Sequence, residues 1–222
     1  MTGFPSSDKI TTAVVTGRHP FDVPAFYAMM RSLKGVDFYV QHMEDFASDA
    51  GQVRTDYDVV LFYNFHIETP TDEGPWYEKA TRQALDQLGQ TKQGIFILHH
   101  AVLAFPQWEF WADLVGIRDR EFTFHIGEKV RVEIADPEHP IGQGLEPWEM
   151  VDETYLMKSA GEDSRAVLSV DHPKSMKVVG WTRTFGQSRV FCLQLGHDGT
   201  AFSNESFRKV IERGIQWCAG KI

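Results

Sequence analysis

Histidines follow three segments of this sequence that have the apolar, β-branched character of buried strands. His99 and His100 come directly after the run GIFIL, His197 follows VFCLQL, and His66 follows DVVLFYNF. In an α/β sheet the carboxyl ends of parallel strands meet at one edge, where ligands bind. Imidazole gains and loses a proton near neutral pH. The sequence therefore predicts an acid–base site at this edge, centred on His99 and His197.

Each histidine also has a structural alternative, because a histidine at a strand end often does no more than hydrogen-bond its surroundings. For His66 taken alone, that alternative is the favoured one. His99 and His100 are adjacent at a strand-to-helix turn, so their side chains diverge and at most one of them faces the site.

Further candidates lie close to these histidines in the sequence or at neighbouring strand ends. The adjacent carboxylates of Asp152 and Glu153 could orient a histidine or bind hydroxyl groups, and Arg183 could hold a carbonyl or carboxylate oxygen. Trp108 and Trp111 could stack on a sugar ring, or could equally well pack their helix onto the sheet. The candidate catalytic residues are His99, His197 and Glu153, and the candidate substrate-binding residues are His66, Trp108, Arg183, Asp198 and Asn204.

Several familiar motifs are missing from the sequence. It contains no GxGxxG and no P-loop, so neither a dinucleotide nor a nucleoside triphosphate is supported. No GxSxG or GxCxG elbow follows a strand, which argues against an acyl-enzyme. The two cysteines, Cys192 and Cys218, do not have zinc spacing. Histidines with nearby carboxylates could bind Zn²⁺ or Mn²⁺, but their spacings are long and the pattern requires no cofactor.

The elements that would position these residues alternate between strand and helix over the first hundred residues. Apolar residues at helical spacing predict helices that begin near Asp22 and Trp76. Strands alternating with helices predict a flavodoxin-like, doubly wound α/β fold, with a mostly parallel sheet and helices on both faces. The strands are predicted at 11–17, 36–40, 58–65 and 94–98.

After Gly116 the sequence alternates apolar and polar residues. The segments 121–126 and 129–135 flank Gly127 and predict a β-hairpin. This predicts a small antiparallel extension inserted before the last parallel strand. Later strands are predicted at 167–170, 178–183 and 190–195, followed by a helix at 204–219 with Asn204 as its cap.

Composition favours a globular protein in which residues 1–222 form one domain. Of its residues 42% are hydrophobic and 24% are charged, and the formal net charge is −9. That charge, with no Lys/Arg cluster, disfavours nucleic acid and membrane surfaces and favours a small molecule or a protein partner. With no signal peptide and no apolar run of about 18 residues, we expect a cytoplasmic protein. The oligomeric state stays open, but Phe122 and Phe124 on the predicted hairpin could form an exposed apolar strip that is compatible with a homodimer.

Residues 92–217 resemble the trehalose-utilisation (ThuA-like) family. The resemblance lies, in order, in GIFILHHAVLAFPQWEFWADLVG, DPEHPIGQGL, DETYLM and VVGWTRTFGQSRVFCLQLGHDGTAFSNESFRKVIERGIQW. It implies a class I glutamine-amidotransferase-like fold, in which His99 takes the place of the catalytic cysteine of amidotransferases and His197 that of their histidine. Because an imidazole at the elbow cannot form a thioester, the resemblance implies a protein that is not a glutamine amidotransferase.

The family also implies a sugar substrate, such as a trehalose-type disaccharide or a keto-sugar. His99 and His197 could then act as general acid and base, with Glu153 fixing a tautomer and Arg183 stabilising an enolate-like oxygen, in isomerisation or elimination on a carbonyl sugar. Two alternatives stay open. One is a non-catalytic sugar-binding or regulatory domain, and the other is a metal-dependent hydrolase that uses the two histidines and a carboxylate.

Overall fold

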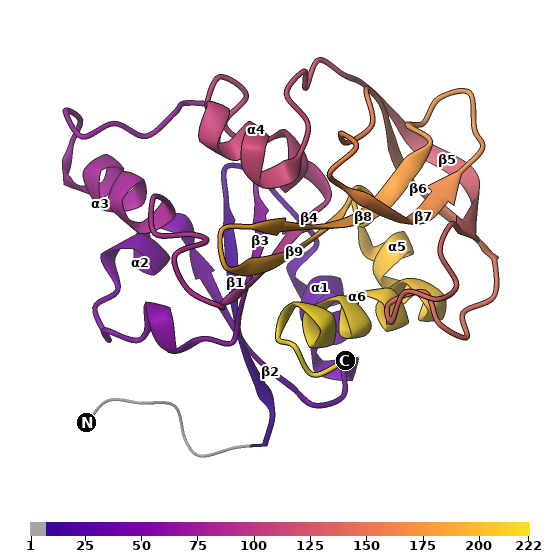
Figure 1. Ribbon diagram of the computed structural model, residues 1–222, viewed down its shortest axis with the longest axis horizontal. Helices are drawn as coiled ribbons and strands as arrows, with labels where there is room; N and C mark the ends of the chain where they lie inside the picture. Colours follow the sequence, from indigo (N-terminus) through magenta and orange to yellow (C-terminus); the bar gives the residue numbers. More distant parts are fainter. Residues whose placement is uncertain (1–7) are drawn as a thin grey trace.

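A twisted mixed sheet runs through the structure, a computed structural model that describes residues 8–222 (Figure 1). Its strands are β1 (Ile10–Gly17), β2 (Val36–His42), β3 (Val59–Asn64), β4 (Gly94–Leu98), β5 (Thr123–Ile134), β6 (Trp148–Leu156), β7 (Arg165–Val170), β8 (Val178–Phe185) and β9 (Ser188–Leu193). Over the described residues their order in the sheet is β2-β1-β3-β4-β9-β8-β7-β5-β6.

The sheet is parallel in one half and antiparallel in the other. Strands β2, β1, β3, β4 and β9 pair in parallel, whereas β8, β7, β5 and β6 continue the same sheet with antiparallel pairings. The α/β class is therefore as expected, but the expectation of a mostly parallel sheet is not confirmed, because the sheet is mixed. The antiparallel strands do not form a small appendage, because they extend the main sheet by four strands.

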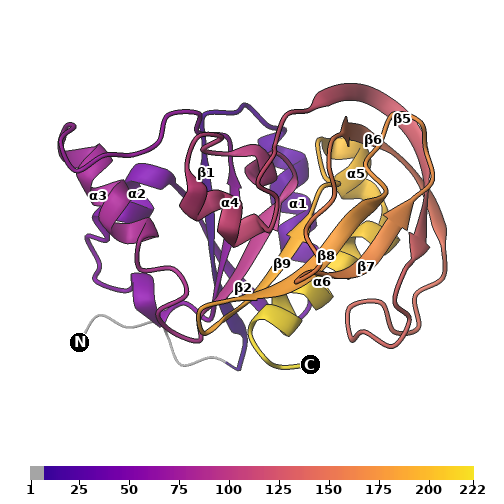
Figure 2. The same ribbon diagram turned by 45° about the horizontal axis from the view of Figure 1, so that its top comes forward.

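Helices cover both faces of the parallel half. They are α1 (Val23–Ser32), α2 (Met43–Ser48), α3 (Trp76–Leu85), α4 (Glu109–Val115), α5 (Gly199–Ser203) and α6 (Glu205–Cys218). Figures 1 and 2 show α1, α5 and α6 on one face and α2, α3 and α4 on the other. Right-handed crossovers explain this division, because the chain moves from β1 to β2 in one direction across the sheet and from β3 to β4 in the other.

Local sequence explains how the helices begin and which face they bury. The Asp22 carboxylate accepts a hydrogen bond from the Ala25 N–H at 3.0 Å and so caps α1. Asn204 caps α6 in the same way through the Phe207 N–H, and the apolar face of that helix buries Phe207, Val210 and Ile211 against the sheet. Every residue of β3 and β4 is buried, as expected of parallel strands covered on both sides.

The prediction of a hairpin around Gly127 is wrong. The segment is one long strand, β5, with an irregularity between His125 and Glu128 where Gly127 has a φ of +72°. Glycine tolerates that left-handed backbone, which suits a bulge as well as a turn. On one side β5 pairs with β7 and on the other with β6, a strand that the sequence pattern did not predict. None of the helices within residues 8–222 is long and apolar enough to cross a membrane.

Candidate functional site

His99 lies at a sharp turn directly after β4. Its φ is +52°, in the left-handed region that is unfavourable for residues other than glycine, and its side chain is fully buried at the start of a short 3₁₀ helix, η2 (His99–Leu103). The ring atom Nδ1 lies 2.5 Å from the carbonyl oxygen of Gln194. A carbonyl only accepts hydrogen bonds, so Nδ1 carries the proton and Nε2 points away from it.

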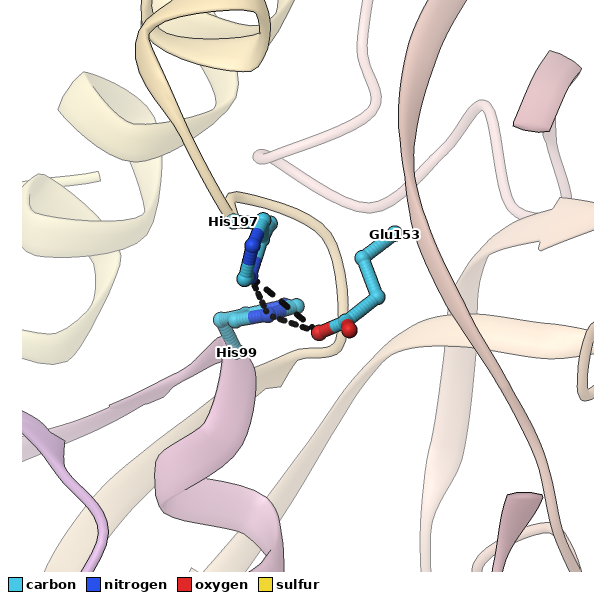
Figure 3. Close-up of side chains that lie close together, drawn as sticks. All are labelled: His99, Glu153 and His197. Carbon is cyan, nitrogen blue, oxygen red and sulfur yellow. Dashed lines mark hydrogen bonds and ion pairs between the residues drawn. The ribbon is translucent and has the colours of Figure 1, made fainter. Parts of the chain in front are cut away.

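Side chains from two distant parts of the sequence, Glu153 and His197, meet at that Nε2 atom (Figure 3). Glu153 Oε2 lies 3.0 Å from His99 Nε2 and 3.2 Å from His197 Nδ1, and the two imidazole nitrogens lie 3.2 Å apart. The Tyr155 hydroxyl also lies 2.8 Å from His99 Nε2. Glu153 and Tyr155 are two residues apart on β6, so they project from the same face of that strand.

Asp152 holds together the two segments that carry Glu153 and His197. Its carboxylate accepts hydrogen bonds from the backbone N–H groups of Glu153 at 2.8 Å, Gly196 at 2.6 Å and His197 at 3.0 Å. The side chain is buried, and burial raises the pKa of the carboxyl above its ordinary value. Asp152 therefore fixes the positions of the backbone segments that carry Glu153 and His197.

Electrostatics divide the protons within this cluster. Burial alone would raise the pKa of the Glu153 carboxyl, but hydrogen bonds and charges from His197 and His99 outweigh it and hold that pKa well below its usual range. The hydrogen bond to Glu153 in turn raises the pKa of His197 above its ordinary value. Glu153 is therefore the ionised member of the cluster, and His197 carries a proton more readily than a free imidazole does.

A cavity of about 290 Å³ opens beside the cluster. Its lining residues are His19, Phe65, His100, Leu103, Phe122, Phe124, Ile126, Glu153, Tyr155 and His197. His99 lies behind Glu153 and His197, while its neighbour His100 reaches the wall. His100 is nearly fully buried and stacks on His19 with 4.3 Å between ring centres; burial lowers the pKa of His100 well below its ordinary value.

A second and larger cavity of about 650 Å³ lies between the ends of β1 and β3, where the strand order reverses. Phe65 lines both cavities. His66 lines the larger one, stacked on Phe105 at 5.5 Å, and its Nδ1 accepts a hydrogen bond from the Asn64 amide at 3.1 Å. Burial lowers the pKa of His66 to about 4. The structure thus places His66 in the neighbouring cavity and not among the residues that line the smaller one.

Trp108 and Arg183 are not brought to the cluster. Trp108 is 7% exposed, its ring is covered by the Arg82 guanidinium, and it lines neither cavity. Arg183 bonds to Asp163 and to the Asp113 carbonyl oxygen. Because β8 runs antiparallel to β9, the end of β8 that carries Arg183 lies at the opposite edge of the sheet from His197.

Asp198 and Asn204 cap helices in the structure. The Asp198 carboxylate accepts hydrogen bonds from Thr200 N–H at 2.8 Å and Ala201 N–H at 3.3 Å, at the start of α5. Asn204 accepts from Phe207 N–H and donates to the Glu149 carbonyl oxygen at 3.2 Å. Their side-chain groups are thus engaged in holding the two helices that follow His197, and neither lines the cavity.

Sequence reasoning missed two residues of this arrangement, His19 and Tyr155. His19 follows β1 by two residues, a strand-end signal of the same kind as that of His99. Tyr155 lies two residues after Glu153, and this spacing would have indicated a shared face if β6 had been predicted as a strand. Among the described residues, His99, Glu153 and His197 are the group whose ligand atoms lie close enough, within 4.8 Å, to hold a metal ion.

Known proteins resemble this chain in sequence and in fold. The family model for trehalose utilisation, ThuA, matches residues 11–218. A putative ThuA-like protein from Parabacteroides merdae has a similar structure, with a TM-score of 0.72 at 19% identity, covering 96% of this chain and 91% of that chain. A cytoplasmic protein from Salmonella typhimurium LT2 has a TM-score of 0.64 at 11% identity, covering 93% and 99%.

A glutamine amidotransferase from Thermotoga maritima has the same general fold, with a TM-score of 0.55 at 10% identity, covering 94% of this chain and 98% of that chain. At this identity the likeness concerns the fold alone. A comparison with curated proteins finds no match to this sequence. With a family match over nearly the whole chain and a glutamine-amidotransferase-like α/β fold, this chain belongs to the trehalose-utilisation (ThuA) family.

Proposed function

We propose that this protein is an enzyme of carbohydrate metabolism that transfers a proton to and from the carbon beside the carbonyl group of a sugar derivative. The observation that carries the proposal is the contact of Glu153 with two imidazoles at the carboxyl edge of the sheet. Ionised Glu153 is free to accept a proton, and the His197 imidazole, whose pKa Glu153 raises, can donate one near neutral pH. The family description, trehalose utilisation, supports a sugar as the class of substrate.

Glu153 and His197 are the members of the cluster that line the cavity, so they form the pair that reaches the substrate. Ionised Glu153 takes the proton from carbon, and protonated His197 gives one to the carbonyl oxygen, which yields an enediol. Glu153 then gives its proton to the former carbonyl carbon, and neutral His197 takes the proton of the neighbouring hydroxyl group, which forms the new carbonyl group of the isomer and restores both side chains. His99 is fully buried behind this pair and does not line the cavity; its Nδ1 contacts the Gln194 carbonyl oxygen and its Nε2 the Tyr155 hydroxyl.

Proton transfer of this kind can be followed by NMR in D₂O with a panel of aldoses, ketoses and keto-disaccharides. We expect the protein to place deuterium on the carbon beside the carbonyl group of at least one of them. Glu153→Gln and His197→Ala should each slow this exchange by about 100-fold or more. Glu149→Gln, an exposed carboxylate on the same strand, serves as the matched control and should exchange at the wild-type rate.

Two outcomes would contradict the proposal. Equal exchange rates in the wild type and in both site variants would place the chemistry elsewhere. Tight binding of a sugar by calorimetry, without exchange of any sugar in the panel, would indicate a non-catalytic sugar-binding domain.

A further inference from the structure

The contacts within the cluster cannot all be hydrogen bonds. His99 Nε2, His197 Nδ1 and Glu153 Oε2 form a closed triangle with sides of 3.0, 3.2 and 3.2 Å. If each imidazole donates a proton to Glu153, two N–H groups face each other along the third side. If His99 keeps its only proton on Nδ1, toward Gln194, its Nε2 lone pair accepts a hydrogen bond from the Tyr155 hydroxyl at 2.8 Å but still faces the Glu153 carboxylate oxygen at 3.0 Å. Protons alone therefore leave at least one side of the triangle unfavourable.

A metal ion at the centre satisfies all three sides at once. Nitrogen and oxygen ligands lie about 2.0–2.2 Å from Zn²⁺, so neighbouring ligand atoms are about 3.0 Å apart at octahedral angles and about 3.4 Å apart at tetrahedral angles. The three measured separations fall within that interval. Two imidazoles and one carboxylate suit Zn²⁺ or Mn²⁺ better than Mg²⁺ or Ca²⁺, which prefer oxygen ligands throughout.

The surroundings of the three atoms are those of a prepared metal site. The His99 Nδ1–H donates to the Gln194 carbonyl, which turns the Nε2 lone pair toward the centre. The Gln194 amide donates to the Glu153 carbonyl oxygen at 3.0 Å, and Asp152 binds the backbone beside both Glu153 and His197. Each ligand therefore comes from a different element and is held by a backbone or carboxylate hydrogen bond.

We infer that His99 Nε2, Glu153 Oε2 and His197 Nδ1 bind one divalent cation, Zn²⁺ or Mn²⁺, with its open coordination positions toward the 290 Å³ cavity. Oxygen atoms of a carbonyl group and an adjacent hydroxyl group suit those positions. Binding of sugar oxygens to the cation rests on the proposed function. There the cation would polarise the sugar carbonyl oxygen in place of the His197 proton. The second carboxylate oxygen of Glu153 would stay available to take the carbon-bound proton. Binding of the cation itself requires no sugar.

Calorimetry with the metal alone tests the inference. Full-length protein without a histidine tag is stripped with EDTA, dialysed and titrated with ZnCl₂ and, separately, with MnCl₂. We expect one equivalent of at least one cation to bind. Glu153→Gln, which keeps the shape of the side chain, should weaken binding by about 100-fold or more, and His197→Ala should do the same. Glu149→Gln should bind as the wild type does, and circular dichroism confirms that each variant is folded.

Less than about 0.2 equivalents bound, or an unchanged affinity in folded Glu153→Gln, would overturn the inference. The two proposals fail separately. One equivalent of cation bound without deuterium exchange on any sugar would contradict the proposed function and leave the cation site standing. If deuterium exchange keeps its full rate after EDTA treatment, in protein that binds no cation, the cation site is contradicted and the proposed proton transfer stands.

Discussion

Asp152→Asn isolates the contribution of the group that holds the site together. The native carboxylate accepts three backbone N–H groups, two through Oδ1 and one through Oδ2. The amide of asparagine has one oxygen, which keeps at best the bonds to Glu153 and His197. Its NH₂ group then faces the Gly196 N–H, which approached the native oxygen to 2.6 Å. Two donors are left facing each other without an acceptor.

The magnitude follows from these contacts. Losing one charge-assisted hydrogen bond and leaving a buried N–H unpaired costs about 2–4 kcal/mol. The substitution also removes a buried negative charge. Burying that charge is unfavourable, as the raised pKa of Asp152 indicates, so its removal offsets part of the loss. We therefore expect the free energy of unfolding to fall by about 2 kcal/mol, at the lower end of that range.

Urea unfolding at pH 7, followed by circular dichroism, measures this change. Glu149→Gln, on the same strand but exposed, is the control and should change the free energy by less than about 0.5 kcal/mol. Because the Gly196–His197 backbone loses an anchor, Asp152→Asn should also weaken cation binding. A variant as stable as the wild type, with unaltered cation affinity, would refute the role that we assign to Asp152.

Three further predictions concern other features of the fold. Folding lowers the pKa of His66 from 6.5 to about 4, so the unfolded chain binds more protons than the folded chain between these pH values. The free energy of unfolding should therefore fall as pH drops from 6.5 to 4, by at most about 3 kcal/mol. Urea unfolding measures this fall, which should be shallower for His66→Gln. Gly196→Ala should lower the free energy of unfolding by about 2 kcal/mol or more, since the φ of +113° strains alanine and its Cβ would lie 2.8 Å from Phe207 Cζ; an unchanged urea midpoint would contradict this. Burial raises the pKa of both thiols, so Cys192 and Cys218 should react with Ellman's reagent only after unfolding, and rapid labelling of the native protein would show that they are accessible.

The parallel half of the sheet could be predicted from sequence because its signals are local. Strand β4 spans the predicted residues, and the capping residues Asp22 and Asn204 begin helices as expected. The contact between His99 and His197 follows from the same logic, since β4 and β9 are neighbouring parallel strands and their carboxyl ends meet. Here the apolar runs that predict the strands also produce the parallel pairing that brings the two histidines together.

Strand β6 and the pairing of the antiparallel strands could not be predicted, because their causes are distant in sequence. Strand β6 carries Asp152 and Glu153, and adjacent carboxylates ordinarily mark an exposed segment. Both are buried because the backbone of Gly196 and His197 and the ring of His99 supply their hydrogen bonds from other strand ends. Arg183 was predicted at the site for a related reason. The residues of β8 do not determine whether that strand runs parallel or antiparallel to β9.

Deuterium exchange into a carbonyl sugar, compared between the wild type and Glu153→Gln, tests the central claim most directly. We predict that the wild type places deuterium on the carbon beside the carbonyl group of at least one sugar in the panel, and that Glu153→Gln does so about 100-fold more slowly or worse while remaining folded. Exchange at the same rate in both proteins would contradict the claim that the cluster of His99, Glu153 and His197 carries out the chemistry.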